Sequence, residues 1–120
     1  MIFPAIELID RYVIAKLKYE KTKGANIDEF MFYHQQITEA NYDLNKVKTE
    51  LEELYKVHSS IWSLESELKS GKEENLPLEE IGRRAIKIRD LNNQRIKLKN
   101  TAAEKLGSTI KEIKQEHLSQ

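Results

Sequence analysis

The chain of 120 residues contains no cysteine, and this absence removes several kinds of chemistry at once. Without thiols there is no disulfide, no thiol nucleophile and no cysteine-ligated metal ion. Proline occurs twice and glycine four times, so few residues can break a helix or form a tight turn. Because Ile and Leu also recur at regular intervals, the sequence predicts an ordered, all-α protein.

No charge of one sign dominates, because 20 Lys and Arg residues balance 20 Asp and Glu residues. Domains that bind nucleic acid usually carry a basic excess, so the zero net charge argues against such a partner. No stretch approaches the roughly 18 consecutive apolar residues of a transmembrane helix. The first residues also lack the basic region and apolar run of a signal peptide. We therefore predict a cytoplasmic protein with no membrane insertion.

Common catalytic and cofactor-binding motifs are missing from the sequence as well. Neither phosphate-binding loop motif occurs, and Gly-x-Ser-x-Gly is absent. His34, His58 and His117 stand far apart and form no metal-binding spacing. The sequence thus predicts no catalytic residue, no metal and no cofactor, and it favours a non-enzymatic protein over an enzyme.

The spacing of apolar residues predicts a single helical domain over 1–120. Pro4 suits the first turn of a helix and Gly24 suits its end, which predicts a helix over 4–22. Neither glycine nor proline interrupts the heptad-like apolar pattern of residues 27–70. That pattern is typical of one long, coiled-coil-like helix.

A third helix is expected over 77–106, because Pro77 restarts the chain after Gly71 and an apolar stripe follows. A short C-terminal helix is expected over 108–117, after a break at Gly107. The two long helices should form an antiparallel hairpin. The first helix should then cover only the part of the hairpin from about 27 to 47.

The outer half of this hairpin has just two helices to bury its apolar side chains. Two helices cannot enclose that much apolar surface, and exposed patches of this size usually mark an interface. We therefore predict that the outer half completes a helical bundle in a homodimer, with a different protein as a further candidate partner. The predicted interface residues are Val57, Ile61, Trp62, Leu64, Ile81 and Ile86.

An unusual polar stretch, Leu-Asn-Asn-Gln-Arg, occupies residues 91–95 on the third helix. Its second and fifth residues lie on or near the apolar stripe, where unpaired polar groups cost about 1 kcal/mol or more each. Glu52, Tyr55 and His58 are the expected partners across the hairpin. A structural polar layer and a binding cleft both explain this pattern.

Basic residues gather on the third helix, but no aromatic residue lies between 78 and 106. Proteins that bind single-stranded nucleic acid usually stack its bases on aromatic rings. Pairing with the acidic residues of the preceding helix is therefore favoured, with nucleic-acid binding as an alternative. The basic residues are Arg83, Arg84, Lys87, Arg89, Arg95, Lys97 and Lys99.

Three segments resemble a pattern in small helical families of unknown function. The stretch 61–65 (Ile-Trp-Ser-Leu-Glu) is followed by 91–95 (Leu-Asn-Asn-Gln-Arg), and 7–11 (Glu-Leu-Ile-Asp-Arg) is similar to the families' opening Glu-Leu-Ile-Asp-Lys. Members are often encoded beside glycosyltransferases in bacterial lipopolysaccharide or capsule clusters, and similar chains occur in phages. The family pattern has a second acid where this chain has Ser66, which argues against a paired-acid site. The residues that the resemblance marks are Asp10, Trp62, Glu65, Asn92, Gln94 and Arg95.

The leading hypothesis is a non-enzymatic helical interaction or scaffold protein. The resemblance implies an accessory role in glycan or surface-polysaccharide assembly. The alternative is a protein or enzyme that binds a small ligand, such as a sugar nucleotide, in a polar cleft around Glu65, Asn92 and Arg95.

Overall fold

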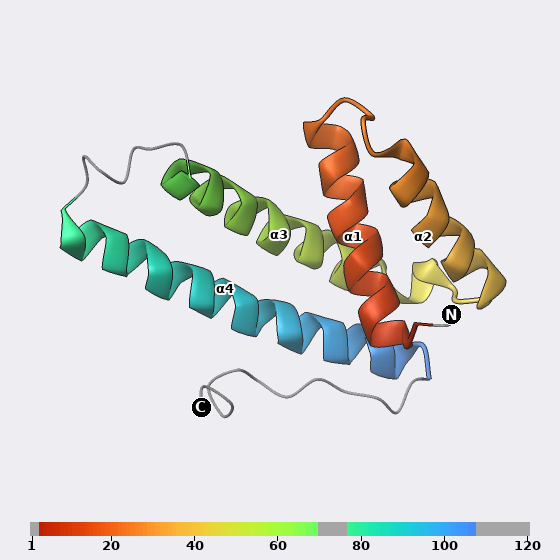
Figure 1. The fold of residues 1–120 in the computed structure, drawn as a ribbon. Helices are drawn as coiled ribbons and strands as arrows, with labels where there is room; N and C mark the ends of the chain where they lie inside the picture. The colour runs from red at the N-terminus through yellow and green to blue at the C-terminus, as the bar shows by residue number, and fades with distance from the viewer. Residues whose placement is uncertain (1–2, 70–76, 108–120) are drawn as a thin grey trace.

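The computed structural model describes residues 3–69 and 77–107 (Figure 1). These ranges contain four α-helices, one short 3-10 helix and no strand, so the predicted all-α class is confirmed. The helix expected over 108–117 lies outside the described residues. In chain order the helices are α1 (Ala5–Lys21), α2 (Ile27–Glu39), η1 (Leu44–Val47), α3 (Lys48–Lys69) and α4 (Leu78–Lys105).

The ends of α1 and α4 follow the residues that predicted them. Pro4 and Pro77 stand directly before the two helices and accept hydrogen bonds from their first turns. Gly24 has a φ of +88°, and its backbone N–H donates to the carbonyl of Tyr19 at 2.8 Å. This left-handed geometry favours glycine and turns the chain after α1.

The prediction of one continuous helix over 27–70 was wrong, because the chain breaks at residues 40–43. Asn41 adopts a left-handed φ of +60°, which asparagine tolerates better than most residues. Two residues later, the Asp43 side chain accepts a hydrogen bond from the backbone N–H of Asn45 at 3.0 Å and begins η1. Short polar side chains can therefore end a helix without glycine or proline, by offering the backbone other hydrogen bonds.

Because of this break, α1 lies in a different position from the one predicted from the sequence. Instead of covering only residues 27–47, α1 packs on α2 and also crosses α3 and α4 (Figure 1). Ile9 and Val13 of α1 are buried with Val47, Leu54 and Ala102, so three helices and η1 share this core.

The helices α3 and α4 lie side by side and run in opposite directions. Near one end Arg84 donates to Glu67, and near the other the Nζ of Lys105 lies 2.6 Å from an oxygen of Glu50. The α1 helix crosses nearer to the second end. No other helix of the described ranges covers the far end of this pair (Figure 1). A second, smaller core lies farther along the pair and is formed by Val57, Ile61 and Leu91.

Candidate functional site

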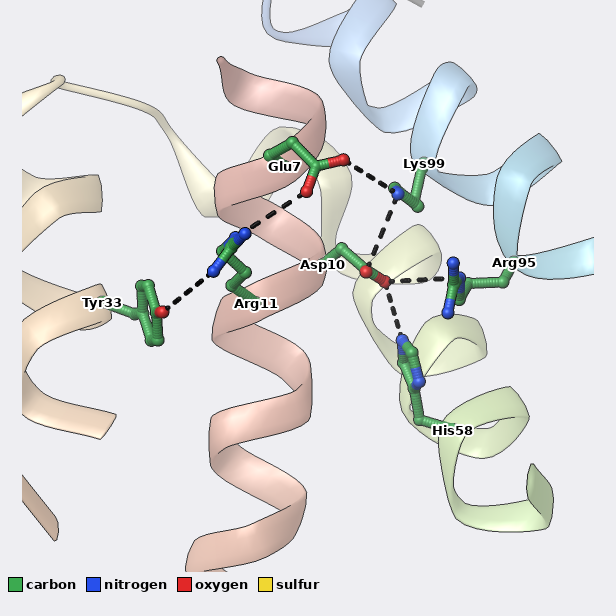
Figure 2. A network of polar contacts seen from close by, with 7 residues as sticks. All are labelled: Glu7, Asp10, Arg11, Tyr33, His58, Arg95 and Lys99. Atoms are coloured by element: carbon green, nitrogen blue, oxygen red, sulfur yellow. Dashed lines mark hydrogen bonds and ion pairs between the residues drawn. The ribbon is translucent and has the colours of Figure 1, made fainter. Parts of the chain in front are cut away.

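Asp10 of α1 lies at the centre of a polar cluster that joins three helices (Figure 2). Its Oδ1 atom is 2.7 Å from the Nε2 atom of His58 on α3. Two side chains of α4 approach the same carboxylate: the Nζ of Lys99 lies 3.7 Å from Oδ2, and the Nε of Arg95 lies 3.9 Å from Oδ1. One carboxylate therefore meets three nitrogen-bearing side chains from the other two helices.

The cluster continues along α1 to its outer side (Figure 2). One oxygen of Glu7 lies 3.3 Å from the Nζ of Lys99, and the other lies 3.7 Å from the Nε of Arg11. Arg11 in turn donates to the hydroxyl of Tyr33 on α2 at 3.4 Å. The polar contacts thus connect α4, α1 and α2 in one chain of contacts.

The centre of the cluster is deeply buried. Lys99 is 1% exposed, Asp10 is 5% exposed and His58 is 6% exposed. Charges taken out of water are costly unless they are paired, and here the carboxylates of Glu7 and Asp10 face the basic side chains of Lys99 and Arg95. The balance of charge explains how a lysine can lie inside so small a core.

Local sequence places these charged residues where apolar side chains are expected. Asp10 follows Ile6 by four residues and precedes Val13 by three, so all three lie on the buried face of α1. His58 occupies the corresponding position on α3, between Leu54 and Ile61. All six of these residues are buried.

The environment of Asp10 favours its ionised form. Burial alone raises the pKa of a carboxyl group, but the hydrogen bond with His58 and the positive charges of Lys99 and Arg95 outweigh it. The pKa of Asp10 is therefore held below its ordinary value. Because an ionised carboxylate only accepts hydrogen bonds, His58 carries its proton on Nε2 and donates it.

A carboxylate that orients an imidazole is one half of many acid–base catalytic sites. A catalytic imidazole must reach a substrate, however, and the ring of His58 is enclosed by the three helices. Within residues 3–69 and 77–107, no three His, Asp or Glu side chains are placed to share a metal ion. The arrangement is suited to holding α1 against α3 and α4.

The residues marked by the resemblance lie in different places. Asp10 and Arg95 meet in the cluster. Asn92 lines an open groove with Arg95 on α4, whereas Glu65 does not line that groove. Trp62 is half-buried on α3. Glu65 and Gln94 are both exposed to solvent.

The prediction that Glu52, Tyr55 and His58 pair with the polar residues of 91–95 was also wrong in part. Tyr55 donates its hydroxyl proton to Glu20, and His58 contacts Asp10, so both reach α1 instead of residues 91–95. Glu52 is exposed. The continuous helix expected over 27–70 had left no room for α1 beside these residues.

Glu7 and Lys99 belong to the cluster, although neither was predicted from the sequence as a site residue. A signal for Lys99 was present, since it lies three residues after Ile96 and three before Ala102, both of which are buried. A lysine within an apolar stripe indicates either a buried ion pair or a break in the stripe.

No protein-family model, curated protein or solved structure matches this chain. The resemblance to helical families of glycan clusters therefore stays a prediction, and so does the accessory role that it implies. None of the helices described here is long and apolar enough to cross a membrane.

Proposed function

We propose that this protein is a helical interaction protein that associates with a second copy of itself through the face of α3 and α4 that α1 leaves uncovered. The observation that carries the proposal is the position of α1 on the α3–α4 pair. This helix covers one end of that face, and the face continues beyond it with no other helix of the described ranges over it (Figure 1).

The continuation can be followed residue by residue on α4. Lys99 contacts α1 and is buried, and steps of three or four residues toward the start of α4 keep to the same side of the helix. These steps reach Asn92, Ile88, Ala85 and Ile81, each of which is half-buried or exposed. A groove of about 540 Å³ runs along Asn92, Ile88 and Ala85.

The same side of α3 leads to Trp62. His58 contacts α1, and residues four and seven positions farther along α3 are Trp62 and Glu65. A half-buried tryptophan beside an uncovered apolar stripe is typical of an interface anchor, because its large ring gains most when water is excluded.

The predicted interface residues divide into two groups. Val57 and Ile61 are 6% and 8% exposed and pack within the chain's own core, so they offer a partner little surface. Trp62 and Ile81 are half-buried, and Ile86 is 52% exposed. Leu64 packs against the core of Val57 and Ile61, but it is not fully enclosed.

Charge on this part of the hairpin favours a second copy as the partner. Glu65 on α3 and Arg89 on α4 are both exposed, so the region carries both signs. In a two-fold symmetric dimer the same surface faces itself, and opposite charges on one surface can pair across the axis. Two hairpins joined in this way make a layer of four helices, which encloses apolar stripes that two helices cannot.

Size-exclusion chromatography with light scattering over about a tenfold range of concentration tests the proposal. We expect a mass about twice the 14.1 kDa of one chain. The variant Ile88→Glu should be a monomer, because it places a charge in the groove. The control Ile27→Glu changes an apolar residue on α2 that is 47% exposed and lies elsewhere, so it should stay dimeric.

Circular dichroism establishes that Ile88→Glu is folded before its mass is interpreted. If this variant does not fold, Ala85→Glu takes its place, since Ala85 is exposed and lines the same groove. A wild-type monomer at every concentration would contradict the proposal. A folded Ile88→Glu or Ala85→Glu variant that remains dimeric would contradict it as well.

A further inference from the structure

A second groove, on another part of the molecule, lies between α1, η1 and the start of α3. Its volume is about 580 Å³, which is within the range of about 300–1,000 Å³ typical of small-molecule sites. Tyr12 and Lys16 line it from α1, while Lys48, Leu51 and Tyr55 line it from α3. Steps of three or four residues along each helix direct these side chains into the same groove.

The two tyrosine rings of the groove are held in place by other contacts. The ring of Tyr12 lies near the rings of Phe30 and His34 on α2, with centroid distances of 5.7 and 6.2 Å. Tyr55 donates its hydroxyl proton to Glu20. Fixed aromatic rings beside an aliphatic wall form a surface for a flat apolar group, and little entropy is lost when such a group binds.

Some charged side chains around the groove have a polar partner within the protein, and others do not. The carboxylate of Glu20 accepts a hydrogen bond from Tyr55, and the Nζ of Lys56 lies 3.5 Å from a carboxylate oxygen of Glu53. Lys16 and Lys48 make no ion pair with any residue in the described part of the chain. The ammonium group of Lys16 instead lies 5.8 Å from the centre of the Tyr55 ring.

Two ammonium groups without carboxylate partners are therefore placed beside an aromatic and aliphatic wall. Glu52, on the same rim, is an exposed carboxylate that can accept a hydrogen bond from an N–H or hydroxyl group. The complementary ligand has a flat ring, a negative group within reach of the lysines, and a hydrogen-bond donor. Nucleoside monophosphates have all three features.

We infer that the groove between α1, η1 and α3 binds a flat aromatic anion of the size of a nucleoside monophosphate. The ring packs against Leu51, Tyr12 and Tyr55, and the anionic group binds Lys16 and Lys48. This site lies away from the dimer surface proposed above, so the two proposals stand independently.

Titration of the ¹⁵N-labelled protein with adenosine 5′-monophosphate, followed by NMR, tests the inference. Saturable shifts should appear within the segments 12–20 and 44–56, which contain the residues that line the groove. Adenosine lacks the phosphate and inorganic phosphate lacks the ring, so each should bind at least about tenfold more weakly. Benzoate tests whether an aromatic carboxylate is accepted in place of a nucleotide.

The variant Lys16→Gln/Lys48→Gln should weaken nucleotide binding about tenfold or more, because it removes both cations. The control Lys21→Gln/Lys46→Gln makes the same change of charge at two exposed lysines that do not line the groove. It should bind within about twofold of the wild type.

Saturable binding of adenosine 5′-monophosphate at the groove supports the inference. Four results would overturn it: no saturable shift with the nucleotide, benzoate binding as strongly as the nucleotide, phosphate binding as strongly as the nucleotide, or equal weakening in both double variants.

Discussion

The Nε2 atom of His58 lies 2.7 Å from the Oδ1 atom of Asp10, although 48 residues separate them in the sequence. Both residues occupy buried positions that would otherwise be apolar. A buried polar pair can fix one arrangement among several that apolar packing alone would allow. Here the pair joins α1 to α3 at the point where α1 crosses the hairpin.

Replacing Asp10 by Asn should lower the free energy of unfolding by about 3–5 kcal/mol. The amide keeps the size of the side chain but removes the negative charge that compensates Lys99 and Arg95. Urea unfolding followed by circular dichroism measures the change. Asp90→Asn is the control, because Asp90 is exposed on α4, and its loss should cost no more than about 1 kcal/mol. Equal losses in the two variants would mean that the Asp10 cluster adds nothing to stability.

The pKa of Asp10 also predicts a dependence of stability on pH. Its folded-state pKa lies below the ordinary value of 3.8. The unfolded chain therefore binds more protons in this region of pH, and the contribution of Asp10 is complete above about pH 5. It is lost as the pH falls through the folded-state pKa.

Urea unfolding of the wild type and of Asp10→Asn between about pH 6 and pH 3 measures this contribution. The difference in stability between the two proteins should narrow as the pH falls, because Asp10 takes up a proton in the unfolded chain at a higher pH than in the folded protein. A difference that stays constant down to pH 3 would show that Asp10 does not titrate as its contacts require.

The sequence was sufficient to predict the fold class and most helix ends. Pro4, Gly24, Pro77 and Gly107 act locally, so their effects can be recognised without knowledge of the tertiary structure. The break at residues 40–43 was missed, because the prediction relied on glycine and proline as helix breakers. Asparagine can adopt a left-handed conformation too, but it does so only in some contexts.

Only part of the polar cluster could be predicted from the sequence, for a related reason. The sequence indicated that polar residues interrupt the apolar stripes, and Arg95 was among those expected to need a partner. The identity of the partner depends on where α1 crosses the hairpin. That crossing depends in turn on the unforeseen break, so His58 was paired with α4 rather than with Asp10.

The left-handed backbone at Asn41 gives a direct test of this break. Asn41→Gly should leave stability unchanged or slightly higher, because glycine adopts a φ of +60° without strain. Asn41→Val should lower the free energy of unfolding by about 1–2 kcal/mol, since a β-branched side chain is strained there. Thermal or urea unfolding compares the two variants. A valine variant as stable as the glycine variant would indicate that α2 continues through this position.

Trp62 is the only tryptophan of the chain, and it lies on the surface that the proposed dimer covers. Its fluorescence therefore reports on association without a label. The most direct test of the account is acrylamide quenching of this fluorescence over about a hundredfold range of protein concentration. We predict weaker quenching and blue-shifted emission as the concentration rises, and no such change in Ile88→Glu. Quenching that is independent of concentration while the molar mass doubles would place the interface elsewhere and contradict the account.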